Sequence, residues 1–166
     1  MAEEAYASFD DYVRHRSVGL QRFAYLITHD REDARDCVQD ALVGLLPRWD
    51  AVVAGGNVDA YVRRSIVNAS VTRWRRTGRV IPVAEPLADR GRGVPDPTAA
   101  WDDADEAWRL CRELPPLQRA AVVLRFYHDL PYAEVARVLG CTENTARSHV
   151  FRALAALRAR LGGERS

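Results

Sequence analysis

Apolar residues recur at intervals of three and four along most of the chain, and this spacing predicts helices. The first such stretch covers residues 9–27, and the polar residues 28–30 interrupt it. Asp30 can cap a second helix, residues 31–46, because its side chain can accept hydrogen bonds from the first free amides of that helix. Pro47 then ends it. No stretch shows the period of two that predicts a strand.

A third helix follows a segment with weak periodicity. Residues 49–57 contain two adjacent glycines and are predicted to form a loop. Asn57 is placed to cap the helix that follows, which continues to about residue 79. The far end of this helix is rich in arginine and contains Trp74, so it could bind single-stranded nucleic acid by stacking and charge. Alternatively, Trp74 belongs to the core and the arginines only keep the helix end solvated.

The chain divides at residues 80–97, which are rich in proline and glycine and have no periodicity. Such a composition is typical of a linker between domains. Helical spacing resumes after it, and Pro116 suits the first position of one of the later helices. The second half is predicted to contain four helices, ending near Leu161.

Residues 131–152 read as two helices about a tight corner, which is the pattern of a helix-turn-helix. Gly140 suits the left-handed residue that ends the first helix, and Thr142 can cap the second. The residues of the second helix that point away from its apolar stripe are Thr145, Arg147, Ser148, Phe151 and Arg152. Such a surface could enter a DNA major groove, although an ordinary helical hairpin would show the same pattern.

These elements predict an all-α fold with two small helical domains, residues 1–79 and 98–166, joined by a Pro/Gly-rich linker at 80–97. The second domain ends in the helix-turn-helix.

Charge is strongly segregated, although the net charge is only +1. Residues 60–79 carry six arginines and no acidic residue, whereas acidic residues dominate residues 1–59 and 80–107. On the second helix Asp33, Asp36 and Asp40 follow one another at intervals of three and four and so share an edge. This edge is either a solvated acidic face or a docking site for a basic partner.

The cysteines and histidines do not predict a catalytic or metal site. Cys37, Cys111 and Cys141 are far apart and odd in number, so we expect reduced thiols. Together with Cys141, His128 and His149 lack the spacing of a zinc site, and we expect no metal and no cofactor.

The chain resembles the extracytoplasmic-function group of bacterial RNA polymerase sigma factors over nearly its full length. Four stretches carry the resemblance: AYLITHDREDARDCVQDAL, DAYVRRSIVNASVTRWRR, LPPLQRAAVVLRFYHDL and the helix-turn-helix. They occur in the family's order on either side of a proline-rich linker. The sequence departs from the family pattern at Arg35 and Thr72, where acidic residues are usual, and at Pro131, where a capping serine is usual.

The resemblance implies a sigma factor that binds core RNA polymerase and reads two promoter elements. Residues 1–79 would be region 2 and residues 98–166 region 4, and the predicted loop at 49–57 would capture a flipped base. The residues implied to bind core polymerase are Asp36, Gln39 and Asp40. Those implied to lie near the minus-10 element are Arg63, Arg64, Asn68, Trp74, Arg75 and Arg76. The minus-35 element would be read by Thr145, Arg147, Ser148, Phe151 and Arg152.

Two other functions stay open at this point. A free-standing helix-turn-helix regulator would share the second domain. An enzyme with a Cys-His site is the other alternative, since Cys37 and His29 are residue types that can form one. No phosphate loop or nucleophile motif supports an enzyme, so we expect none. The acidic start and the lack of a long apolar run predict a cytoplasmic protein without membrane insertion. The resemblance adds an anti-sigma factor as a further partner to consider.

Overall fold

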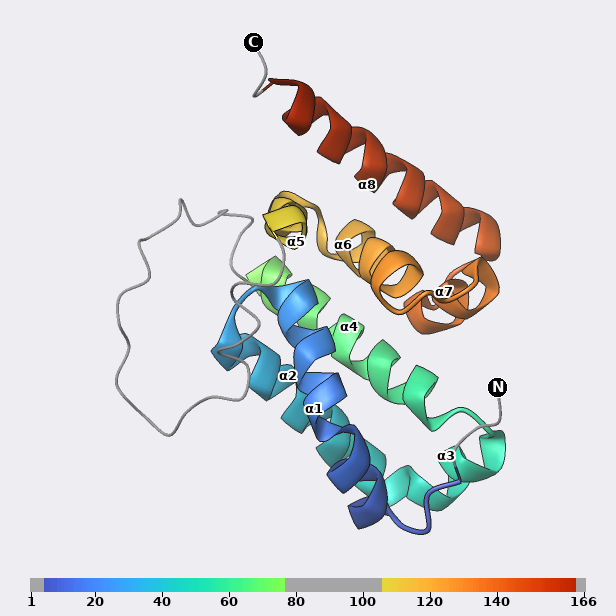
Figure 1. Cartoon of the computed structure of the whole chain (residues 1–166). Helices are drawn as coiled ribbons and strands as arrows, with labels where there is room; N and C mark the ends of the chain where they lie inside the picture. Colours follow the sequence, from blue (N-terminus) through green and yellow to red (C-terminus); the bar gives the residue numbers. More distant parts are fainter. Residues whose placement is uncertain (1–4, 77–105, 164–166) are drawn as a thin grey trace.

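The computed structural model describes residues 5–76 and 106–163, and each regular element within these ranges is helical. The first half contains α1 (Phe9–Thr28), α2 (Arg31–Leu45), α3 (Trp49–Gly55) and α4 (Val58–Arg76). The second half contains α5 (Glu106–Leu110), α6 (Pro116–Val122), α7 (Tyr132–Leu139) and α8 (Glu143–Gly163) (Figure 1). Shorter helical turns are η1 (Leu46–Arg48), η3 (Cys111–Glu113) and the π-helical η4 (Val123–Tyr127). The all-α prediction is confirmed, and the predicted linker at 80–97 lies outside the described residues.

The predicted helix caps form as expected. The Asp30 carboxylate accepts a hydrogen bond from the backbone N–H of Asp33 at 2.8 Å, at the start of α2. The Asn57 side chain accepts one from the N–H of Ala60 at 2.9 Å, at the start of α4. Because each bond satisfies an amide that the helix itself cannot pair, these caps fix where α2 and α4 begin.

The prediction of a loop at residues 49–57 is wrong, because the segment forms the short helix α3. Trp49 packs edge-on against Phe9, with ring centroids 5.9 Å apart, and also lies against Tyr12. Gly56, with φ of 94°, ends the helix in the left-handed conformation. A seven-residue helix has little intrinsic stability, so these contacts with α1 stabilise α3, and the local sequence pattern does not show them.

The two halves of the chain share one apolar core. Buried residues of α1, α2 and α4 and buried residues of α6, α7 and α8 belong to a single cluster. α4 packs against both α6 and α7, and α1 packs against α6. Figure 1 shows α6 and α7 between α4 and the long helix α8. The helical domains are therefore docked on each other.

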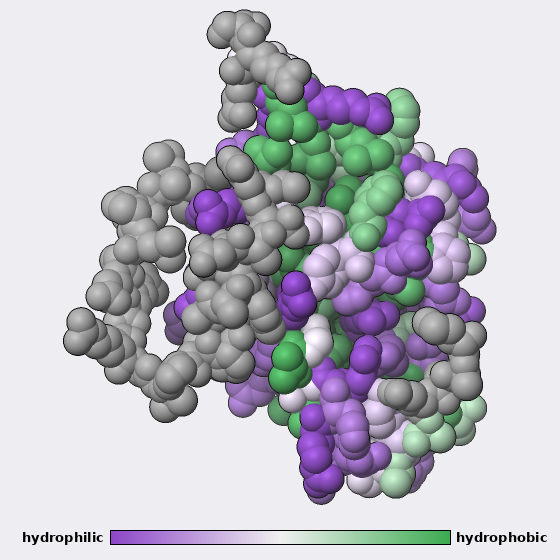
Figure 2. Space-filling model, in the orientation of Figure 1, coloured by the Kyte–Doolittle hydropathy of each residue, from purple (hydrophilic) through white to green (hydrophobic). Residues whose placement is uncertain are grey.

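The surface carries scattered apolar side chains. Figure 2 shows apolar residues gathered over the C-terminal half of α8, where Leu161 is 51% exposed. Among residues 5–76 and 106–163, no helix combines the length and apolar character needed to cross a bilayer.

Candidate functional site

The corner between α7 and α8 has the geometry that the sequence predicts for a helix-turn-helix. Gly140 adopts φ of 67° and ends α7. Thr142 then accepts a hydrogen bond from the N–H of Thr145 at 3.1 Å, which caps α8. Ala146 and Val150 of α8 are buried against the rest of the second half. The predicted motif is confirmed down to its glycine and its cap.

The outward face of α8 presents the five predicted DNA-reading residues. Phe151 is 73% exposed. An open hollow on this face is lined by Arg147, Ser148, Phe151 and Arg152. Arg147 is held in place: its guanidinium contacts Glu143 at 2.6 Å and lies 4.4 Å from the ring centre of Tyr132. Thr145 and Arg152 are exposed. Two guanidinium groups and an aromatic ring on one helix face can reach base edges and phosphates.

The predicted minus-10 residues all lie on α4, but they do not share one environment. Arg64, Asn68, Arg75 and Arg76 are exposed, whereas Arg63 and Trp74 are half-buried. Burial lowers the pKa of the Arg63 guanidinium, although it remains charged at neutral pH. The Arg64 guanidinium lies against the helix-turn-helix corner, close enough that a methyl group on Gly140 would approach its Nη2 to 2.9 Å. The structure thus places part of this set beside the second half of the chain.

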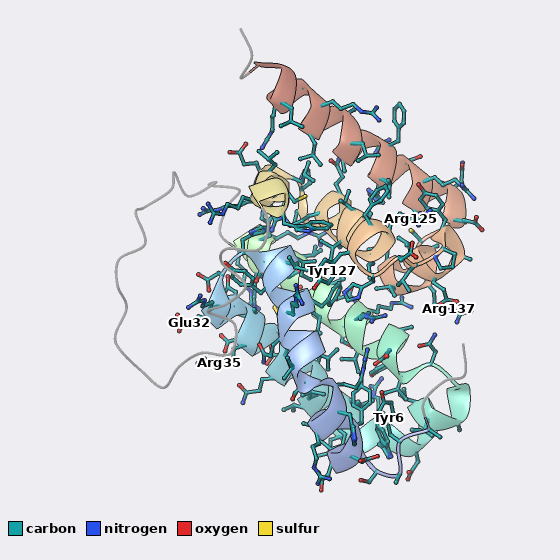
Figure 3. All side chains as sticks on the ribbon, in the orientation of Figure 1. Tyr6, Glu32, Arg35, Arg125, Tyr127 and Arg137 are labelled. Atoms are coloured by element: carbon teal, nitrogen blue, oxygen red, sulfur yellow. The ribbon has the colours of Figure 1, made fainter. Side chains whose placement is uncertain are left out.

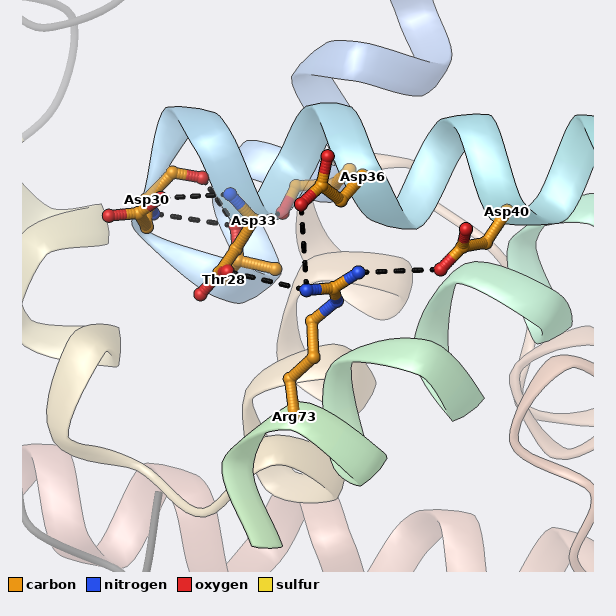
Figure 4. A network of polar contacts seen from close by, with 7 residues as sticks. Thr28, Asp30, Asp33, Asp36, Asp40 and Arg73 are labelled. Carbon is orange, nitrogen blue, oxygen red and sulfur yellow. Dashed lines mark hydrogen bonds and ion pairs between the residues drawn. The ribbon is translucent and has the colours of Figure 1, made fainter. Parts of the chain in front are cut away.

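The predicted acidic edge faces outward on α2, and it has a counter-ion from α4. Asp36 and Asp40 are 45% and 65% exposed, and Gln39 is exposed between them. Arg73 ion-pairs with both carboxylates and with Asp33 (Figure 4). The sequence placed Arg73 in the basic end of α4, and it did not show that this side chain turns toward α2.

Sequence reasoning missed Arg119, a buried cation on α6. Its guanidinium donates hydrogen bonds to the carbonyl oxygens of Cys111 and Leu114, each at 2.9 Å, and to those of Arg112 and Ile27. Ile27 belongs to the last turn of α1, so this side chain joins the two halves of the chain. The sequence feature that could have indicated a buried arginine is that Arg119 is followed directly by five apolar residues, 120–124.

Two histidines lie in the same contact region and are held neutral. Burial lowers the pKa of His29 to about 3, with further lowering from Arg119 and Arg112. Burial likewise lowers the pKa of His128 to about 4, and Arg63 adds to the effect. The His128 ring packs edge-on against Phe23 of α1, with centroids 5.4 Å apart. The contact between the halves therefore combines apolar packing with neutral imidazoles beside arginines.

The cysteines are free thiols in the structure. Burial raises the pKa of Cys37 to about 11 and also raises that of Cys111, so both are poor nucleophiles at neutral pH. No group of three or more His, Cys, Asp or Glu side chains within the described ranges could hold a metal ion.

Comparison with known proteins identifies the halves. Residues 12–80 match Sigma-70 region 2, and residues 104–157 match Sigma-70, region 4. An RNA polymerase sigma-E factor of Streptomyces avermitilis is 35% identical over 97% of this chain and 89% of the relative. The ECF RNA polymerase sigma factor SigM of Mycobacterium tuberculosis is 36% identical over 98% of this chain and 81% of the relative. The chain belongs to the ECF sigma factors.

Solved structures of other proteins share the fold of this chain. The sigma factor RpoE of Bartonella quintana, in complex with the anti-sigma factor NepR, aligns with a TM-score of 0.68, 24% identity and coverage of 93% of this chain and 96% of that one. CnrH, in complex with the cytosolic domain of CnrY, aligns with a TM-score of 0.64, 22% identity and coverage of 93% and 88%.

The family assigns the activity of the whole chain. As a sigma factor, the protein binds core RNA polymerase and promoter DNA and directs promoter-specific initiation of transcription.

Proposed function

We propose that this sigma factor docks on core RNA polymerase through the acidic edge of α2 and reads promoter DNA with α4 and α8. Asp36, Gln39 and Asp40 form the docking edge. The first half of the chain acts near the minus-10 element, and the second half reads the minus-35 element. The observation that carries this proposal is the outward face of α8, where Arg147 and Arg152 are presented by a capped helix at a helix-turn-helix corner.

The minus-35 assignment rests on the chemistry of α8. A guanidinium can donate two hydrogen bonds to guanine O6 and N7, and a good contact of this kind discriminates by about 1–3 kcal/mol against other bases. Arg147 is held by Glu143 and Tyr132, which reduces the entropy lost when it binds a base. We assign Thr145 and Ser148 to phosphate or backbone-edge contacts, and Phe151 to a thymine methyl group or the sugar edge.

The minus-10 assignment rests on the exposed basic face of α4. Arg64, Asn68, Arg75 and Arg76 are exposed there, and basic side chains on one helix suit a nucleic-acid backbone. The half-buried Arg63 and Trp74 complete the proposed set, and α3 at residues 49–55 would capture a flipped base together with the turn that follows it.

We further propose that the protein has no catalytic site of its own, which the raised pKa of the buried thiols supports. It acts in the cytoplasm, where core polymerase and the chromosome are. An anti-sigma partner is supported by the complex in which RpoE of Bartonella quintana was solved.

The proposal is tested with purified core polymerase and two double variants. Charge reversal at Asp36→Arg with Asp40→Arg should abolish co-purification with core polymerase, because like charges would then face a basic partner surface. Truncation at Arg147→Ala with Arg152→Ala should leave co-purification intact and abolish run-off transcription from a promoter that the wild-type protein recognises.

Each variant serves as the control for the other. Normal co-purification of the charge-reversed protein would remove the docking edge from α2, and equal loss of core binding by the α8 variant would remove its assignment as a DNA reader. Sequence-specific DNA binding by the isolated protein, without polymerase, would favour a free-standing regulator.

A further inference from the structure

Arg73 stands out among the basic residues of α4 because its side chain crosses to the acidic edge of α2. Its Nη1 lies 3.7 Å from an oxygen of Asp33 and 3.6 Å from one of Asp36, and its Nη2 lies 3.3 Å from one of Asp40. Figure 4 shows the guanidinium between the carboxylates, with the second oxygen of Asp36 pointing away from it. One cation therefore spans the full length of a row of three anions.

The row stays open on its outer side. Arg73 contacts one oxygen of each carboxylate, and a carboxylate has a second oxygen that can accept from another donor. The carboxylates of Asp33, Asp36 and Asp40 are 47%, 45% and 65% exposed, whereas the Arg73 side chain is 31% exposed. Three negative charges with one positive charge still leave a net negative surface, so the row can attract a basic partner.

Arg73 contacts α2 through the three carboxylates and through Cys37, but it is not the main link between α2 and α4. Buried apolar residues already join these helices, among them Ala34 and Val38 of α2 and Val62 and Ile66 of α4. Exposed ion pairs contribute little to stability. The larger effect of the guanidinium is local, because carboxylates three and four residues apart on one helix repel each other and a cation between them offsets that repulsion.

We propose that Arg73 is a positioning residue for the docking of core RNA polymerase: it aligns Asp33, Asp36 and Asp40 as one charged row and presents their outer oxygens to basic side chains of the polymerase. The proposal rests on the proposed function of the α2 edge. It also adds Asp33 to the docking residues. A partner that meets a pre-aligned row loses less conformational entropy than one that must order three separate side chains.

The test measures the affinity of the full-length protein for purified core polymerase. Arg73→Ala should weaken binding by about fivefold to tenfold, because the row is no longer aligned. Arg73→Lys keeps the charge in place and should restore most of the affinity. Arg137→Ala is the charge-matched control, since Arg137 is an exposed arginine of α7 that pairs with Glu134 at 3.4 Å. Figure 3 shows Arg137 on the opposite side of the molecule from Glu32 and Arg35 of α2.

The pH profile of binding separates this role from a merely structural one. Burial already raises the pKa of Asp33, with a further increase from Asp30, and Arg73 opposes that rise. The charges of Asp36 and Glu32 also raise the pKa of Asp33. Without Arg73, Asp33 should therefore take up a proton at a higher pH, and affinity should begin to fall at a higher pH than in the wild type. A loss of helix packing alone would lower affinity without moving the midpoint of this profile.

Unchanged binding by Arg73→Ala, with an unshifted pH profile, would overturn the proposal. Tighter binding would also overturn it, because Arg73 would then compete with the polymerase for the carboxylates. If the Asp36→Arg, Asp40→Arg protein also binds normally, the docking edge itself is wrong. If that protein fails to bind while Arg73→Ala binds normally, only the role of Arg73 is wrong. Should Arg73→Ala unfold, Arg73→Gln keeps a polar side chain, and the same two measurements decide.

Discussion

Arg119 links backbone segments that are far apart in the sequence. Its guanidinium bonds carbonyl groups near the C-terminal ends of α1 and of the α5–η3 segment, where a helix leaves its last carbonyls unpaired. A positive charge is also favourable at a helix C-terminus. Burial lowers the pKa of Arg119 only to about 10, so it stays charged at neutral pH. One side chain thereby satisfies backbone groups in both halves.

Replacement of this guanidinium should be among the most destabilising single changes in the chain. Arg119→Met keeps much of the volume but leaves several buried carbonyls unpaired, and we expect the free energy of unfolding to fall by at least about 3 kcal/mol. Urea denaturation followed by circular dichroism measures the loss. Arg112→Met is the control, because Arg112 contributes its backbone carbonyl to the contact and its side chain is exposed. Equal losses in the two variants would contradict the role of the guanidinium.

For single residues, the sequence predicted the hydrogen bonds that form with near neighbours in the chain. Asp30 and Asn57 cap helices whose first turns follow directly, so their residue types and positions were sufficient. The partners of Arg119 and Arg73 come from other helices, and no spacing within one helix shows them. The acidic edge was therefore predicted and its counter-ion was not.

The helix-turn-helix corner shows how much of an element its local sequence determines. Gly140 adopts the left-handed conformation that a glycine tolerates best, and Thr142 caps the next helix, so the corner followed from the sequence. α3 was missed because seven residues carry too little periodicity, and its helix depends on Trp49 packing against α1. The helix-turn-helix corner was predictable because its glycine and its cap lie close together in the sequence. α3 was not predictable because contacts with another helix stabilise it.

A pair of glycine substitutions tests the conformation of the corner. Gly140→Ala forces an alanine into φ of 67° and toward the Arg64 guanidinium, and it should destabilise the fold by about 1 kcal/mol or more. Gly19→Ala is the matched change in the middle of α1, where the added carbon meets nothing within 4 Å. It should stabilise by up to about 1 kcal/mol because alanine favours helices. Urea midpoints of the two variants are compared, and shifts in the same direction would contradict the assignment.

Over the whole molecule, the docking of the two halves is the feature that the sequence could not predict. A linker of prolines and glycines sets no angle between the domains that it joins, and the apolar faces of α4 and α6 look like ordinary core stripes. The structure shows that these stripes meet each other, together with the Phe23–His128 contact.

The shared core predicts that the two halves unfold together. Trp49 reports on the first half through Phe9 and Tyr12, and Trp108 reports on the second through Tyr127, with ring centroids 5.6 Å apart. We compare two variants, one with Trp49 as its sole tryptophan and one with Trp108 as its sole tryptophan. In each variant, tryptophan fluorescence should give the same urea midpoint as circular dichroism. Distinct midpoints for the two tryptophans would show that the halves are stable independently and that the contact between them is weak.

The packing of Arg64 against the Gly140 corner bears on how strongly any ligand can bind that side of α4. If a ligand needs the halves apart, its apparent dissociation constant equals the intrinsic one divided by the fraction of molecules that are open. Every 1.4 kcal/mol by which the docked form is favoured then weakens apparent binding by about tenfold. Substitutions at the contact that touch no ligand, such as changes at Phe23, would thus alter the threshold concentration at which such a ligand occupies α4.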